Sequence, residues 1–148
     1  MTYLTPHFTL EEMTTTQVRG WDNTPSPEVQ TALLATATQL ESVRTLLAKP
    51  ITINSGYRSV KVNEVVGGTP NSAHITGQAV DFVCPAYGPP LDICIAIEKS
   101  PLNFDQLIQE GTWVHLSFAP ASRRNIITKT KTGYAAGLAK GTHNAQNA

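Results

Sequence analysis

Two histidines and one aspartate of this 148-residue chain have the residue types and the spacing of a metal site. His74 and Asp81 lie seven residues apart with mostly small residues between them, and His115 lies downstream in the apolar segment 113–118. Two imidazoles and one carboxylate suit a catalytic zinc ion, because three protein ligands leave a fourth position to water. The pattern therefore favours a site for one zinc ion.

Each of these residues also has an ordinary interpretation when it is taken alone. A single histidine such as His74 is typically a surface or hydrogen-bonded residue, and His115 could be a hydrogen-bonded histidine of the core. Asp81 is harder to explain in this way, because a carboxylate within an apolar strand must be paired, hydrogen-bonded or metal-bound. The three residues together favour the metal site.

A zinc hydrolase also needs a base that deprotonates water and a donor that stabilises the oxyanion. Glu110 is the candidate base, with a solvated turn residue as its ordinary interpretation. Arg58 is the candidate donor to the oxyanion or to a substrate carboxylate, since its fork donates two parallel hydrogen bonds; a plain surface arginine is the alternative. Ser72 could hydrogen-bond the substrate or support the loop before His74, and both roles stay open.

A predicted hairpin positions Glu110 relative to His115. Two strands, 104–109 and 113–118, surround Gly111 and Thr112, so a two-residue loop pairs Glu110 with Trp113. Alternation then puts Glu110 and His115 on one face of the hairpin. It turns Val114, Leu116 and Phe118 toward the core, and it puts Asp105 on the other face from Glu110.

The other elements follow from caps and periodicity. Thr9 and Glu12 form a capping box for a short helix, and Ser26 with Pro27 begins a longer amphipathic one. The predicted elements are that helix at about 28–48, strands at 51–54 and 78–83, a helix at 91–99 and a strand at 125–131. Residues 60–71 are predicted to be mostly loop, and the chain from Gly133 onward is predicted to fray.

Composition narrows the class of protein. Eleven basic and eleven acidic residues cancel, which argues against nucleic acid or an anionic membrane surface as a partner. No apolar run approaches the ~20 residues of a membrane span, and the first residues lack the pattern of a signal peptide. Cys84 and Cys94 are predicted to be free thiols. We expect one domain at 1–132, a Gly-, Ala- and Asn-rich tail at 133–148, and a monomer.

These motifs together resemble the zinc D-alanyl-D-alanine carboxypeptidase family. The resemblance is greatest to its small bacteriophage and prophage members, which cleave peptidoglycan peptides, and it runs from about residue 8 to about residue 118. The residues that carry it are Ser72, His74, Gly77, Ala79 and Asp81, with segment 55–59 before them, Asn63, Val66, Gly67 and Gly68 between, and Trp113, Val114 and His115 after them.

The resemblance implies roles and a fold. It implies that His74, Asp81 and His115 are the zinc ligands and that Arg58 and Ser72 lie around the substrate cleft, where we also expect Tyr57 to bind substrate. The implied fold is α+β, with helices packed on a small antiparallel sheet whose open face holds the zinc, as in hedgehog and D-Ala-D-Ala metallopeptidase-like domains.

The implied function is hydrolysis of peptide bonds in bacterial peptidoglycan. Many relatives carry their catalytic acid three residues before the last histidine, where this chain has Thr112; we expect Glu110, five residues before it, to serve instead. The alternative is a zinc-stabilised peptidoglycan-binding module without catalysis. L-Ala–D-Glu endopeptidase and D-Ala–D-Ala carboxypeptidase activities both suit the site, and the phage-type resemblance favours the first. We expect synthesis in a bacterial host cytoplasm without a signal peptide and action at the cell wall, in the periplasm, during phage lysis or wall degradation.

Overall fold

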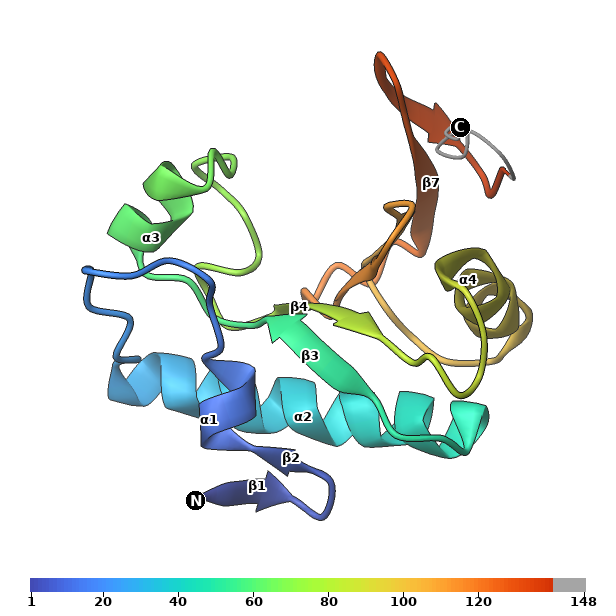
Figure 1. Cartoon of the computed structure of the whole chain (residues 1–148). Coiled ribbons are helices and arrows are strands. Elements are labelled where there is room, and N and C mark those ends of the chain that lie inside the picture. The colour runs from blue at the N-terminus through green and yellow to red at the C-terminus, as the bar shows by residue number, and fades with distance from the viewer. Residues whose placement is uncertain (140–148) are drawn as a thin grey trace.

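A six-stranded sheet forms the centre of the molecule, and helices cover one of its faces (Figure 1). The computed structural model describes residues 1–139. The strand order is β3–β4–β6–β5–β7–β8. The strands are β3 (Thr52–Ser55), β4 (Ala79–Val83), β5 (Gln106–Gln109), β6 (Val114–Ser117), β7 (Asn125–Thr130) and β8 (Gly133–Ala136).

The sheet is mixed, which corrects the prediction of an antiparallel one within an α+β fold. Every neighbouring pair is antiparallel except β5 and β7, which are parallel. The cause is the position of the chain after β6. Because β6 ends at Ser117 opposite Gln106, the chain leaves it beside the beginning of β5. The Asn125 amide then donates to the Asp105 carbonyl at 2.9 Å, so β7 starts where β5 starts and runs in the same direction.

The helices and a small ribbon complete the described chain. They are β1 (Tyr3–Thr5), β2 (Phe8–Thr9), α1 (Leu10–Met13), α2 (Pro27–Leu47), α3 (Val60–Val65) and α4 (Pro90–Lys99). The predicted caps are confirmed. The Thr9 hydroxyl accepts from the Glu12 amide at 3.1 Å while the Glu12 carboxylate accepts from the Thr9 amide at 2.9 Å, and Ser26 caps α2 with Pro27 as its first residue. No helix of residues 1–139 is long and apolar enough to cross a membrane.

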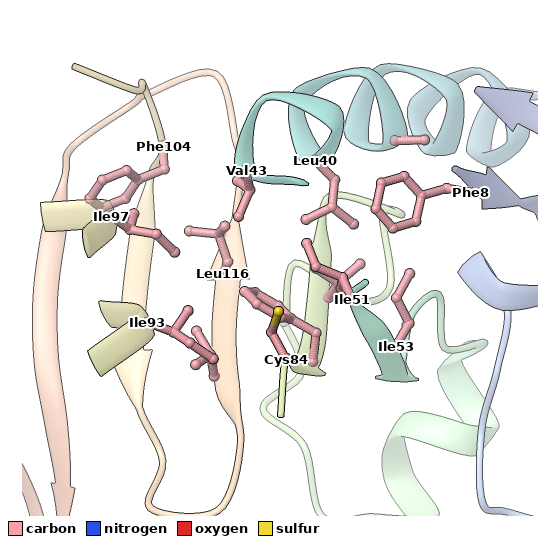
Figure 2. Packing of buried hydrophobic residues seen from close by; sticks show 14 of the residues in the cluster. Phe8, Leu40, Val43, Ile51, Ile53, Cys84, Ile93, Ile97, Phe104 and Leu116 are labelled. Carbon is pink, nitrogen blue, oxygen red and sulfur yellow. The ribbon is translucent and has the colours of Figure 1, made fainter. Parts of the chain in front are cut away.

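The hydrophobic core lies between the sheet and helices α2 and α4 (Figure 2). Strand alternation turns Val80 and Phe82 of β4 and Leu116 of β6 into this layer, where α2 contributes Leu40 and α4 contributes Ile97. Each such buried side chain stabilises the fold by roughly 1.5–3 kcal/mol. The same alternation leaves the intervening residues of β4 and β6 on the opposite face of the sheet, with the packed core behind them.

Two predictions about irregular segments are wrong. Residues 60–65 form α3, capped by Ser59, whose hydroxyl accepts from the Val62 amide at 3.2 Å. This helix buries only Val62 and Asn63, so the sequence has no apolar periodicity from which the helix could be predicted. Residues 133–136 do not fray: they form β8, which pairs with β7. The predicted tail boundary thus falls in the turn between these strands, and residues 140–148 of that tail lie outside the described residues.

Candidate metal centre and its cavity

The structure brings His74, Asp81 and His115 together on the sheet face away from the core. Asp81 of β4 and His115 of β6 are direct cross-strand neighbours, and His74 lies in the loop before β4. Asp81 Oδ1 lies 2.9 Å from His115 Nδ1 and 3.2 Å from His74 Nε2. One ligand atom from each residue lies within 4.8 Å of the other two, which is the arrangement expected around a single ion.

The loop before β4 is fixed at several points, so His74 is held firmly and is only 2% exposed. The Ser72 hydroxyl accepts from the His74 amide at 3.1 Å, and the Arg58 amide donates to the His74 carbonyl at 3.0 Å. The loop is also tied to α2, because the Thr36 hydroxyl donates to the Gly77 carbonyl at 2.7 Å. Ser72 therefore supports the loop, one of its two predicted roles, and it also lines the cavity described below.

The hydrogen bonds of His74 determine which ring nitrogen carries the proton. Its Nδ1 lies 2.7 Å from the carbonyl oxygen of Gly56, which can only accept, so Nδ1 is the donor. Gly56 itself is held beside Met13, where a Cβ would collide with the Met13 backbone carbonyl, so glycine is required at this position. Nε2 consequently points its lone pair at Asp81.

This geometry fits a bound cation. The oxygen of Asp81 that faces His74 Nε2 can only accept, so either a second proton on the buried imidazole or a cation must lie between the two acceptors. Two imidazole nitrogens and one carboxylate oxygen are a donor set that zinc prefers, and all three residues line an open cavity from which a fourth ligand can enter. The residues present therefore fit zinc.

Asp81 contacts both histidines of the cluster and Arg58. Burial raises the pKa of its carboxyl, but the close contacts with His115 and His74 outweigh burial and hold that pKa well below its ordinary value. Its second oxygen, Oδ2, lies 3.5 Å from Nη2 of Arg58. Arg58 thus contacts a predicted zinc ligand as well as the cavity.

Asn63 holds Arg58 in place and was not recognised as a site residue from the sequence. Its side-chain oxygen accepts from Arg58 Nη1 at 3.2 Å and its amide donates to the Thr69 carbonyl at 2.9 Å. A Cβ at Gly68 would overlap the Asn63 oxygen, so glycine is required there. The only feature of the sequence that could have pointed to Asn63 was its place, with Gly68, among the residues that carry the family resemblance. Burial is the main cause of a lowered pKa at Arg58.

Glu110 lies where the hairpin prediction put it. Its amide donates to the Trp113 carbonyl at 3.1 Å, and its side chain lines the same cavity as His115. Burial raises the pKa of Glu110, and the positive charges of His115, Lys129 and Arg58 offset only part of that effect. A raised pKa brings a carboxylate closer to the range in which a general base works best.

The cavity has a volume of about 600 Å³ and two walls. Thr69, Asn71 and Ser72, from the loop after α3, line one wall; Ile127 of β7 and Tyr134 of β8 line the other. Figure 1 shows α3 and β7 rising on either side of β4.

Two residues lie elsewhere than expected. Asp105 lines the cavity although it was predicted to face away from Glu110, because β5 begins only at Gln106 and alternation does not extend to it. Its carboxylate accepts two hydrogen bonds from the guanidinium group of Arg123, at 2.9 and 2.8 Å, and one from the Arg123 backbone amide at 3.1 Å. Tyr57 is not among the residues that line the cavity: its side chain is 8% exposed and packs in the core. The structure therefore gives no support to substrate binding by Tyr57.

Comparison with known proteins identifies the family. The family model described as Peptidase M15 matches residues 6–117, which include all three residues of the cluster and Glu110. This chain belongs to the peptidase M15 family. A zinc D-Ala-D-Ala carboxypeptidase of Streptomyces albus G is 46% identical to it over 50 residues, which are 33% of this M15 chain and 20% of that protein. The chain thus spans about one fifth of that relative, and β7 and β8 lie beyond the part that matches the family.

Proposed function

We propose that this chain is a zinc-dependent peptidase that hydrolyses peptide bonds of bacterial peptidoglycan, with His74, Asp81 and His115 as the ligands of one zinc ion. The observation that carries the proposal is the convergence of these three donors, within the family-matched region, on the floor of a cavity that Glu110 also lines. Zinc at such a site polarises a scissile carbonyl and lowers the pKa of water.

The chain's own residues supply the remaining functions. Glu110 accepts the proton of the attacking water and delivers it to the leaving amine, because its carboxylate shares the cavity with the metal cluster and has a raised pKa. Arg58 holds Asp81 through their contact and presents a positive charge toward the developing oxyanion. Ser72 keeps His74 in place, because its hydroxyl accepts a hydrogen bond from the His74 backbone amide.

We favour an L-Ala–D-Glu endopeptidase over a D-Ala–D-Ala carboxypeptidase. The phage-type motifs support this choice. The Streptomyces relative, by its name, acts as a carboxypeptidase. We further propose a hedgehog-like arrangement of the domain, a monomer, and action at the cell wall after synthesis in a bacterial host, as in phage lysis.

Digestion of purified peptidoglycan tests the proposal. Wild-type protein loaded with zinc should release new amino and carboxyl termini, while chelator-treated protein and Glu110→Ala should not. Mass spectrometry of the muropeptides identifies the bond, since cleavage after L-Ala and loss of a terminal D-Ala give different masses. A protein that binds zinc and peptidoglycan yet releases no new termini would be a binding module, and the peptidase proposal would be wrong.

A further inference from the structure

The β7–β8 hairpin contributes to the cavity although it lies outside the family-matched region. Ile127 is the register partner of Ile108 in β5, which in turn lies opposite His115 in β6, so Ile127 continues the row of the metal cluster across the sheet. Both Ile127 and Ile108 line the cavity. Strands β7 and β8 therefore extend the face that carries the predicted zinc ligands.

A second row leads from Glu110 to Tyr134. Gln109 is the partner of Thr128, so the next position along the two parallel strands puts Glu110 beside Lys129. Lys129 is the partner of Tyr134 on β8. The electrostatic effects agree with this placement, because the charge of Lys129 lowers the pKa of Glu110, and the charges of Glu110 and Asp81 add to burial in raising the pKa of Tyr134.

The hairpin is held firmly enough to act as a wall. Thr128 is fully buried, its hydroxyl donates to the Gly137 carbonyl at 2.8 Å, and it accepts from the Ala139 amide at 3.0 Å. The Gln109 side chain donates to the Ala139 carbonyl at 3.4 Å and so links the end of the hairpin to β5. The position of β8 is therefore fixed by hydrogen bonds that Thr128 of β7 and Gln109 of β5 make with the residues that follow it.

Tyr134 has the properties of a ligand-binding side chain. It is 56% exposed and lines the cavity, and the ammonium group of Lys129 lies 5.0 Å from its ring centre, which restrains the ring. Among residues 1–139 its hydroxyl has no hydrogen-bond partner. An aromatic ring with a free hydroxyl at a cavity wall presents both an apolar surface and a donor to a bound peptide.

We propose that Tyr134 is a substrate-binding residue, whose hydroxyl donates to a carbonyl or carboxylate oxygen of the peptide bound between the hairpin and the metal cluster. The inference rests on the proposed peptidase function. It assigns a contact with substrate to a part of the chain that the family model does not cover, and it leaves the chemical step to Glu110 and the metal ligands.

Binding without turnover tests the proposal directly. In zinc-loaded Glu110→Gln protein, titration calorimetry with a purified peptidoglycan stem peptide gives the Kd, and adding Tyr134→Phe should weaken binding roughly threefold to tenfold, the effect of losing one hydrogen bond. Tyr3→Phe is the matched control: it removes a hydroxyl from a tyrosine that is 62% exposed on β1 and is not among the lining residues, and it should leave the Kd unchanged.

The active protein provides a second readout. Tyr134→Phe alone should raise KM by a similar factor and leave kcat within twofold. An unchanged Kd, a fall in kcat at constant KM, or no binding of the peptide by the parent protein would each overturn the role of Tyr134. Failure of the wild-type protein to hydrolyse peptidoglycan would instead overturn the peptidase function, and the calorimetry would still decide whether Tyr134 binds the peptide.

Discussion

The metal cluster and the β7–β8 hairpin are built differently although they share one cavity. Asp81 and His115 lie on central strands with a neighbour on each side and with the packed core directly behind them. Tyr134 lies on the edge strand β8, whose side chains are mostly exposed, beyond the family-matched region. The proposed zinc ligands therefore occupy the most constrained part of the sheet, and the proposed substrate-binding residue occupies a part that can change without disturbing them.

The largest effect expected from this comparison comes from Asp81→Asn. The substitution keeps the shape of the side chain but removes the charge that both imidazoles and Arg58 contact. We expect the protein to lose bound zinc and hydrolysis to fall by more than about a hundredfold. Metal analysis after dialysis, together with muropeptide release, measures both. Asp105→Asn, which alters another carboxylate of the cavity, should keep the zinc; full zinc occupancy in Asp81→Asn would show that the cluster is not the metal site.

Glu110→Gln should separate chemistry from metal binding. Because Glu110 is not a member of the ligand cluster, the variant should bind zinc as the wild-type protein does. Hydrolysis should fall by roughly 10²–10⁴, the contribution of a general base. Rates of muropeptide release by zinc-loaded protein provide the measurement. A loss of less than tenfold would mean that another group serves as the base.

The contrast between the central strands and the β7–β8 hairpin also explains which features could be predicted from the sequence. Strand alternation and a two-residue hairpin depend on neighbouring residues, so they correctly placed Glu110 and His115 on one face and Leu116 toward the core. The parallel pairing of β7 with β5 depends on residues far apart in the sequence, and β8, with Gly133 and two alanines, has little to bury. The strand predicted at 125–131 forms β7, but its place beside β5 and the existence of β8 had no local signal, so Tyr134 was missed.

Asn63→Ala should have an intermediate effect, because it weakens the support of the cluster without removing a ligand. The change leaves the Thr69 carbonyl and one nitrogen of Arg58 without their partner. We expect the free energy of unfolding to fall by about 1–3 kcal/mol and kcat/KM to fall about tenfold, with zinc still bound. Urea unfolding and steady-state kinetics measure the two effects, with exposed Asn103→Ala as the control. Wild-type kinetics in Asn63→Ala would show that Arg58 needs no support from this side chain.

The smallest expected effect is a loss of stability that depends on pH, and it comes from the ion pair of Arg123, just before β7, with Asp105. Hydrogen bonds from Arg123 hold the pKa of Asp105 below its ordinary value, and burial opposes them only in part. A lowered pKa in the folded state means that the ionised pair stabilises the fold fully above the ordinary aspartate pKa of about 4, and that this stabilisation is lost as the pH falls below that value and through the lowered pKa of the folded state. Arg123→Gln should therefore destabilise the protein at pH 7, by less than Asn63→Ala does, and should matter less at pH 3. Urea unfolding at the two pH values tests this, and equal losses at both would show that the ion pair does not fasten the hairpin. Zinc content should stay unchanged at pH 7, since Arg123 hydrogen-bonds Asp105, just before β5, and contacts none of the three predicted ligands through these bonds.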